Sequence, residues 1–251
     1  MLAENSERLI KEWWDSASEY YQKEISEDKM NTVQYGPFGS SEEKLKLLGK
    51  IKGKDILELG CGGGQVSIAL AKKGAACTGI DISNKQIEFA VENAKKEGVK
   101  VEFIRLPFSH INKLKPRKFD VIISVMALQY CTDLRAILKN VLDLLVKNGI
   151  FVFSIEHPFY LLIDPKDMKI KESYFDSGLK IKKERWPDKS IHYFAYYDRK
   201  VSDIVNLILE SGLKLERIIE PFDKEDRIWG RGYRRALINK IGPTIIFKCR
   251  K

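Results

Sequence analysis

A glycine-rich turn beside an acidic residue is the segment of this sequence best suited to chemistry. The apolar run Asp55–Leu59 is predicted to be a buried strand, and glycines follow it at positions 60, 62, 63 and 64. Because glycine has no Cβ, a ligand can approach the main chain closely there, and the helix predicted next offers unpaired amides at its start. Glu58 puts a carboxylate beside this turn, which favours a cationic or amine-bearing ligand over a pyrophosphate.

Two common phosphate-binding motifs do not fit the turn. A dinucleotide fingerprint that begins at Gly60 would need its third glycine where Gln65 stands. A P-loop would need Gly-Lys followed by Ser or Thr, and these residues do not follow here. The turn therefore indicates a ligand of another kind.

Strands and helices alternate around this turn. Apolar runs predict strands at 55–59, 76–80, 99–106, 119–125 and 150–155, with helical patterns between them at 62–73, 83–96 and 133–147. Ser83 is placed to cap its helix and Gly98 to end it. Because strand–helix–strand units are right-handed, this order predicts an open, doubly wound, mostly parallel α/β sheet with a ligand crevice at the carboxyl ends of its strands.

The chain after His157 leaves this alternation and then returns to it. Residues 158–198 are too long for a plain connection and predict an inserted β-hairpin cap over the crevice. A helix at 201–210 and two strands, at 213–219 and 244–249, would complete a seven-stranded sheet. The expected units are a helical segment at 1–50, a core made of 51–157 and 199–251, and the cap at 158–198.

In these residues the chain resembles the class I S-adenosylmethionine-dependent methyltransferases, in their small-molecule branch (methyltransferase-domain 11-like). The first motif of that family is an acid followed by alternating glycines, and Glu58, Gly60, Gly62 and Gly64 match it. The resemblance implies a Rossmann-like methyltransferase fold with S-adenosyl-L-methionine as cofactor. It also implies that the turn, Cys61 included, passes beside the methionine part of the cofactor.

A second family motif is matched where the second predicted strand ends, at Gly79–Ser83. The resemblance implies that Asp81 grips both ribose hydroxyls of the cofactor, since a carboxylate can accept two donors at once. It implies as well that Ile82 packs on the adenine.

The third and fourth strands lead into further family positions. Phe119–Tyr130 resembles the fourth motif, which implies that Ser124 and Val125 lie under the cofactor. After the third strand many relatives place Asp-Ala, whereas this chain has no acid in register. We therefore expect backbone groups near Phe108 and the Ser109 hydroxyl to hold the adenine.

The amino-terminal segment resembles a helix that closes over the cofactor in the small-molecule branch. Its pattern is Trp14-Asp15-x-Ala17-x-x-Tyr20, and Tyr20 is the contact that the resemblance favours. The alternative is that Tyr20 is an aromatic of the core, because helical spacing alone fits either role.

Methyl transfer depends mainly on alignment, so a catalytic side chain is not strictly required. If a base is used, His157 is one candidate because it follows the fifth strand and would project at the crevice. His192 is the other candidate, reaching down from the cap. A structural role is the alternative for His157, which precedes a fixed proline, and a surface position is the alternative for His192.

Composition limits the class of protein. The chain has 251 residues, 44% hydrophobic and 31% charged, which is typical of an ordinary globular protein and not of a disordered one. Its four scattered cysteines indicate neither a disulfide framework nor a metal site. The charged amino terminus does not fit a signal peptide and no apolar stretch is long enough to span a bilayer, so we expect a cytoplasmic protein without a membrane partner.

The favoured interpretation is a methyltransferase that acts on a small molecule. An RNA (tRNA) methyltransferase is the main competing hypothesis, because much of the net charge of +9 lies near the carboxyl terminus. The residues that would contact such a nucleic acid are Arg231, Arg234, Arg235 and Lys240. Two further hypotheses are a non-catalytic S-adenosylmethionine-binding protein and a nicotinamide-dependent dehydrogenase. The oligomeric state is left open.

Overall fold

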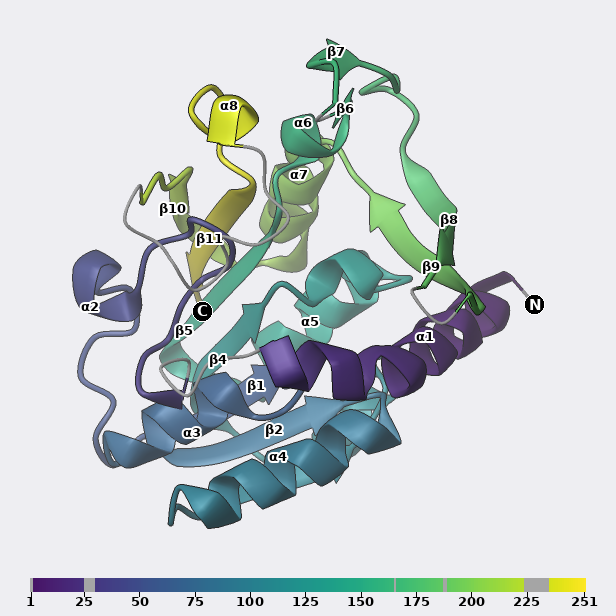
Figure 1. The fold of residues 1–251 in the computed structure, drawn as a ribbon. Helices are drawn as coiled ribbons and strands as arrows, with labels where there is room; N and C mark the ends of the chain where they lie inside the picture. Colours follow the sequence, from purple (N-terminus) through teal and green to yellow (C-terminus); the bar gives the residue numbers. More distant parts are fainter. Residues whose placement is uncertain (1, 25–29, 165, 187–188, 224–234) are drawn as a thin grey trace.

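A seven-stranded sheet in the order β10-β11-β5-β4-β1-β2-β3 forms the centre of the computed structural model, which describes residues 2–24, 30–164, 166–186, 189–223 and 235–251 (Figure 1). Its strands are β1 (Asp55–Leu59), β2 (Ala76–Asp81), β3 (Val101–Arg105), β4 (Phe119–Val125), β5 (Leu145–Glu156), β10 (Lys214–Ile219) and β11 (Thr244–Arg250). β11 runs antiparallel to both of its neighbours, and the other pairs are parallel. The predicted doubly wound, mostly parallel α/β fold is confirmed.

Helices cover both faces of the sheet because its central strands are apolar on both sides. In β1, Leu57 packs into the core on the face of α5 and α7, whereas its neighbour Ile56 packs on the face of α3. The helices, with the 3-10 turns written η, are α1 (Leu2–Glu24), α2 (Glu42–Leu45), α3 (Gln65–Lys72), α4 (Asn84–Lys96), η2 (Phe108–Leu114), η3 (Leu128–Tyr130), α5 (Leu134–Leu144), α6 (Pro158–Leu161), α7 (Val201–Ser211) and α8 (Arg235–Ile238). Among the described helices, none has the length and apolarity to cross a membrane.

Two element boundaries differ from the sequence-based expectation. The helix expected from residue 62 begins at Gln65, because Gly62 and Gly64 have φ of +50° and +82°, which a right-handed helix does not allow. The helix expected to reach residue 147 ends at Leu144, and β5 begins directly after it. Asn148 then takes a φ of +62° within β5, near an irregular step in the β4–β5 pairing.

The inserted segment forms the expected hairpin, with strands β8 (Gly178–Arg185) and β9 (Ile191–Asp198) in antiparallel register. Two short strands, β6 (Ile163–Asp164) and β7 (Lys169–Ile170), precede it. Pro187 and Asp188, which lie between the two strands in the sequence, are outside the described residues. The hairpin lies beside the amino-terminal half of α1 (Figure 1). It contacts α1, and α1 in turn covers the crevice.

Candidate active site

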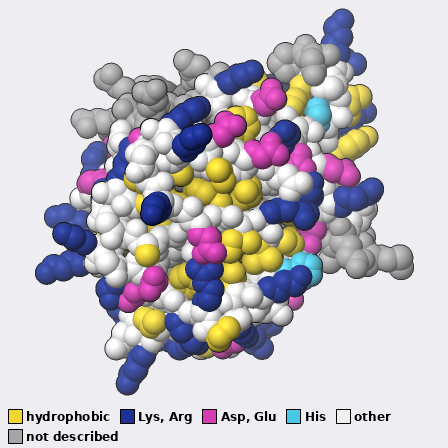
Figure 2. Space-filling view, turned by 90° about the horizontal axis from the view of Figure 1, so that it is seen from below, with side chains coloured by type: hydrophobic (Ala, Val, Ile, Leu, Met, Phe, Trp, Pro, Cys, Tyr) yellow, Lys and Arg dark blue, Asp and Glu magenta, His cyan; other side chains and the backbone are white. Residues whose placement is uncertain are grey.

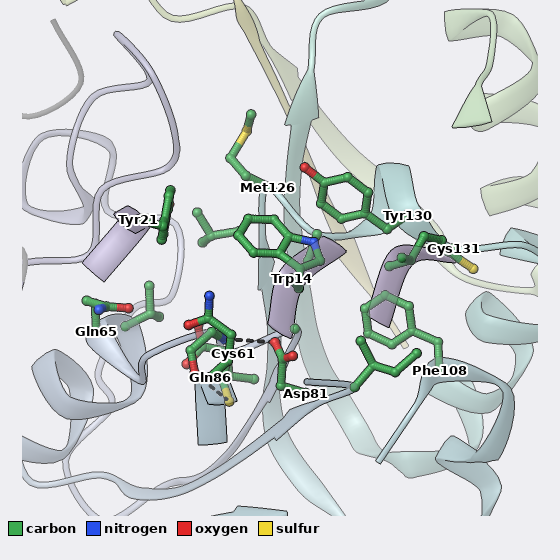
Figure 3. Close-up of a pocket in the computed structure, with 18 of the residues that line it drawn as sticks. Trp14, Tyr21, Cys61, Gln65, Asp81, Gln86, Phe108, Met126, Tyr130 and Cys131 are labelled. Carbon is green, nitrogen blue, oxygen red and sulfur yellow. Dashed lines mark hydrogen bonds between the residues drawn. The ribbon is translucent and has the colours of Figure 1, made fainter. Parts of the chain in front are cut away.

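A pocket of about 140 Å³ lies at the carboxyl ends of β1, β2 and β4, beneath α1. In the view of Figure 3, Trp14 occupies the centre, with Asp81 below it, Tyr21 to one side and Tyr130 to the other. The lining combines apolar and polar groups: Glu7, Ile10, Trp14, Tyr21, Thr32, Gln34, Glu58, Gly60, Cys61, Gly62, Gln65, Val66, Asp81, Ile82, Gln86, Phe108, Val125, Met126, Ala127, Tyr130, Cys131 and Thr132.

The glycine turn forms one wall of this pocket. The backbone amides of Gly60 and Cys61 both donate to the Ile80 carbonyl, at 2.8 and 2.9 Å, which ties the turn to β2. Gly60 has a φ of +71°, and a Cβ built on it would lie 2.3 Å from the Cβ of Ala127. Only glycine therefore fits between the turn and the segment that follows β4.

The predicted turn residues do not all face the pocket. Gly60, Cys61 and Gly62 line it, as expected from the sequence, but Gly64 does not. A Cβ on Gly64 would lie 2.7 Å from the Phe103 ring of β3, so its glycine is required by the packing of the turn against the sheet.

Asp81 ends β2 and is held by the backbone. Its carboxylate accepts hydrogen bonds from the amides of Gly62 and Ser83, both at 2.9 Å. Burial raises the pKa of this carboxyl from 3.8 to about 6, although the backbone donors oppose the shift. Because a carboxylate has about four acceptor positions, Asp81 keeps acceptor capacity toward the pocket. Ile82 lines the pocket directly after it.

Glu58 lines the pocket too, but it is engaged with α3. One carboxylate oxygen accepts from both the amide and the hydroxyl of Ser67, at 2.9 and 2.6 Å. Burial raises the pKa of Glu58 to about 8, and the nearby charge of Asp81 adds to the increase. Burial therefore favours the neutral form of this carboxyl over the charged form on which the expectation of a cationic ligand relies.

Helix α1 closes the pocket through polar bridges to α4. The Ser83 hydroxyl donates to Asp15 at 2.6 Å, and the Gln22 side-chain amide donates to Gln86 at 2.7 Å. These bonds join the residues before and inside the first turn of α4 to one face of α1. They hold α1, and with it Trp14 and Tyr21, over the pocket.

The tyrosine that the resemblance favours as a cofactor contact does not line the pocket, but its neighbour does. Tyr20 is 63% exposed and lies outside the pocket lining, whereas Tyr21 lines it. Trp14 and Tyr21 are seven residues apart and so share a helix face, from which residue 20 is rotated by about 100°. The i, i+7 spacing of these aromatics is the sequence signal that identifies Tyr21.

Two predicted serine contacts also fall outside the pocket lining. Ser109 is exposed and donates to Glu7 at 3.0 Å. Ser124 is fully buried and donates to the Leu59 carbonyl at 2.9 Å, so it ties β4 to β1. Phe108 and Val125, their predicted companions, do line the pocket.

Neither predicted histidine reaches the pocket. The ring of His157 hydrogen-bonds Glu220 at 2.7 Å through Nε2 and accepts from the Phe159 amide at 3.1 Å through Nδ1, which caps α6. His192 stacks on Trp186 and hydrogen-bonds the Ser190 hydroxyl at 2.7 Å. Both rings are held by structural contacts, and the described pocket lining contains no histidine.

Gln86 is a pocket residue that the sequence-based prediction missed. Its side chain is buried, it lines the pocket, and its Nε2 has no hydrogen-bond partner in the structure. This leaves a donor directed at whatever fills the pocket. Gln86 stands three residues after the cap Ser83, the position of a capping-box glutamine, but the Ser83 amide donates to Asp81 instead, and the Gln86 oxygen accepts from Gln22.

Of the four basic residues predicted to contact a nucleic acid, only Lys240 has a described side chain. Arg231 and Arg234 lie outside the described residues, and Lys240 is exposed after α8, which begins at Arg235. On the face shown in Figure 2, Lys and Arg are mixed with Asp and Glu instead of forming one stripe. That face therefore lacks the single-sign pattern of a nucleic-acid site.

Comparison with known proteins places this geometry in a family. The model of a methyltransferase domain matches residues 50–187. An S-adenosylmethionine-dependent methyltransferase of Mesorhizobium loti has 25% identity and a TM-score of 0.66, over 82% of this chain and 95% of that one. A putative methyltransferase of Listeria monocytogenes, 23% identical with a TM-score of 0.64, covers 84% of this chain and 96% of its own, and supports the fold.

Two sequence relatives differ in how much they share. A protein of Haemophilus influenzae named only as uncharacterized is 27% identical over 94% of this chain and 95% of its own length. The ubiquinone biosynthesis O-methyltransferase of Histophilus somni is 30% identical, and the match spans 60% of this chain and 61% of that enzyme. The matched domain holds the glycine turn and Asp81, and the chain belongs to the methyltransferase-domain family of S-adenosylmethionine-dependent enzymes.

Proposed function

We propose that this protein transfers the methyl group of S-adenosylmethionine to a small-molecule acceptor by in-line displacement. The observation that carries the proposal is one pocket in which the Gly60–Gly62 turn, the Asp81 carboxylate and the aromatic face of α1 meet. The pocket fits the cofactor chemically. Asp81 supplies an acceptor for hydroxyls, Gln86 an unpartnered donor, and the turn a wall without side chains beyond that of Cys61.

Each part of the cofactor has a matching part of the lining. Asp81 would accept the two ribose hydroxyls, with Ile82 and Phe108 against the adenine. The Gly60–Gly62 turn would leave room for the methionine portion, next to Glu58. Gln86 would donate to an acceptor of the cofactor with its free Nε2. The bound cofactor supplies the reactive methyl group on its sulfonium.

The contribution of the protein to the reaction is alignment. Holding the acceptor atom and the methyl group in line can remove about 7–11 kcal/mol of the barrier without a base. Burial raises the pKa of the Tyr21 phenol and that of the Cys61 thiol, which disfavours the anionic form of both groups.

The acceptor side of the pocket is aromatic. Trp14 makes edge-on contacts with Tyr21 and Tyr130, with ring centroids 5.4 and 5.7 Å apart. Met126 completes this wall. An apolar or planar small molecule suits such a surface, and the O-methyltransferase relatives act on a small molecule by name. We therefore place the acceptor between α1 and η3.

Cofactor binding is tested by isothermal titration of S-adenosylmethionine into the wild type and the Asp81→Asn variant. We expect about 10- to 100-fold weaker binding in the variant, because the amide offers one acceptor oxygen where the carboxylate offers two. Asp203→Asn on α7, away from the pocket, is the control and should bind normally. Equal affinity in all three proteins would refute the assignment of Asp81.

The acceptor class is tested by incubating the protein with methyl-labelled S-adenosylmethionine and a metabolite extract, with total tRNA at low salt in a parallel sample. Label in a small-molecule fraction is the expected result. Label in the tRNA would show that the acceptor is a nucleic acid, and no label in either sample would refute methyl transfer to both classes.

A further inference from the structure

A second cavity lies on the other side of η3 from the candidate active site. Its volume is about 30 Å³, enough for about two groups the size of a water molecule or an ammonium ion. It is lined by the ends of β5 and β9 together with η3, α6 and the segment before β8. Gln129 of η3 faces this cavity, whereas the next residue, Tyr130, lines the active-site pocket.

Two hydrogen-bond acceptors on residues that line this cavity have no donor. The Oε1 of Gln129 is buried without a partner in a side chain that is only 6% exposed. The Oδ1 of Asp198, where β9 ends, is also buried without a partner. The Glu156 carboxylate, where β5 ends, lines the same cavity. Buried polar atoms in native proteins are nearly always hydrogen-bonded, so the two unpartnered oxygens of Gln129 and Asp198 indicate a missing donor.

The cations near the cavity are already engaged. Arg199 lines it, but its guanidinium donates to the Cys131 carbonyl and lies over the Tyr197 ring at 5.1 Å. Lys182 acts on Glu156 through its charge, but its ammonium lies over the Tyr196 ring at 4.8 Å. Lys180, which acts on Asp198, pairs with Glu172 at 3.3 Å. Glu156 and Asp198 therefore face the cavity without a hydrogen-bonded cation, and Asp176 adds a third carboxylate to the lining.

We propose that this cavity binds the protonated amino group of a small primary amine. An ammonium group carries three N–H donors and one positive charge, which matches Gln129, Asp198 and Glu156 in number and in sign. Lys182, Lys180 and Arg199 act on these carboxylates through their charge without donating to them, so an ammonium group would supply the hydrogen-bonded cation that a water molecule cannot. This site goes beyond the proposed methyl transfer and does not depend on it.

The test compares the thermal unfolding of the full chain at about pH 8, where an amine of pKa near 10 is protonated. The probes are methylammonium chloride, potassium chloride and tetramethylammonium chloride, each at about 100 mM so that ionic strength is equal. Tetramethylammonium is the baseline, because it has the charge but no N–H donor. We expect methylammonium to raise the midpoint by about 2–4 °C over this baseline.

Variants tie the response to the cavity. Glu156→Gln keeps the shape and removes one charge, and Gln129→Met removes the amide at similar volume; each should lose most of the methylammonium response. Glu92→Gln, an exposed change on α4, is the charge-matched control and should keep the response. Because burial raises the pKa of Glu156, the Gln variant relieves a buried charge and should fold well.

Three outcomes would overturn the proposal. Methylammonium could stabilise no better than tetramethylammonium, which would leave water as the occupant. Potassium could stabilise as much as methylammonium, which would make the cavity a site for monovalent metal ions. Folded Glu156→Gln and Gln129→Met variants could respond as the wild type does, which would place the binding elsewhere.

Discussion

Gly60 shows how a single residue shapes the candidate site. Its φ of +71° and the 2.3 Å approach of a built Cβ to Ala127 exclude a larger residue. We predict that Gly60→Ala lowers the free energy of unfolding by about 2–4 kcal/mol, from backbone strain and overpacking together. The matched control is Gly53→Ala, which has a φ of +74° but no atom within 4 Å of the added Cβ, and should lose only about 1 kcal/mol. Chemical denaturation measures both, and equal losses would contradict the packing argument.

A second prediction concerns Glu58 and the pH dependence of the free energy of unfolding. Its folded-state pKa of about 8 lies above its ordinary value of 4.5, so the protonated carboxyl is favoured in the folded protein. The stabilising contribution is therefore complete below pH 4.5 and is lost as the pH rises through 8. Glu58→Gln imitates the protonated group. Its free energy of unfolding should change less with pH than that of the wild type, and at pH 9 it should be higher by a few kcal/mol. Denaturant titrations between pH 5 and 9 measure this, and parallel profiles would refute it.

The sequence predicted pocket-lining residues well where the backbone conformation determines their position. It predicted them less well where the position depends on the direction of a side chain. Gly60 and Asp81 follow from a strand that ends in a turn. Ser124 was misjudged because its hydroxyl turns to the Leu59 carbonyl, and the direction of one hydroxyl is not encoded in a motif. Of the two roles left open for His157, the structure supports the structural one, because Glu220 engages its ring, a contact that the sequence does not show.

At the scale of elements, Phe194 is the ring at the centre of the contact between the hairpin and α1, which also includes a 2.8 Å hydrogen bond between Ser6 and Tyr197. Phe194 of β9 lies 4.7 Å from Trp13 and 5.6 Å from Tyr130, measured between ring centroids. We predict that Phe194→Ala loosens the hairpin and α1 and lowers the free energy of unfolding by about 1–3 kcal/mol. Hydrogen exchange should quicken in β8, β9 and α1 but not in β4 and β5.

The neighbouring Tyr193 is the natural control for this prediction. It is 48% exposed on the opposite side of β9, so Tyr193→Ala should leave exchange in α1 unchanged. Faster exchange in α1 in both variants would mean that the hairpin contributes through its strand pairing and not through the aromatic contact.

Most elements were predictable because the residues that start and end them are close in sequence to the elements themselves. Ser83 caps α4 by accepting from the Gln86 amide at 3.1 Å, and Gly212 ends α7 with a φ of +92°. The start of α3 was predicted three residues early, because a glycine-rich turn and a first helical turn have the same apolar pattern. The pairing of β8 with β9 could be predicted from the alternation of apolar residues. The packing of this hairpin against α1 could not be predicted, since that contact joins distant parts of the chain.

At the scale of the whole molecule, the sheet order explains why the pocket lies where it does. β1 and β4 are neighbours at the centre of the sheet, although β2 and β3 separate them in sequence. The connections after β1 and β4 therefore leave toward opposite faces, and a crevice opens between them. Strand count and direction could be predicted from the sequence. The closure of this crevice by α1 required the resemblance to a family, because no periodicity indicates which helix covers a crevice.

This closure leads to a prediction about how ligand binding spreads through the molecule. Trp14 and Tyr21 of α1 line the same pocket as Asp81 of β2, so a ligand that fills the pocket adds contacts to both. Because S-adenosylmethionine binds the folded state, we expect saturating cofactor to slow hydrogen exchange in α1 and η3. Exchange in α7 should change only as much as global stability does, since α7 packs on the sheet away from the pocket. NAD at the same concentration is the control and should slow neither. Equal slowing in α1 and α7 would mean that the cofactor stabilises the fold as a whole without closing the helix over the pocket.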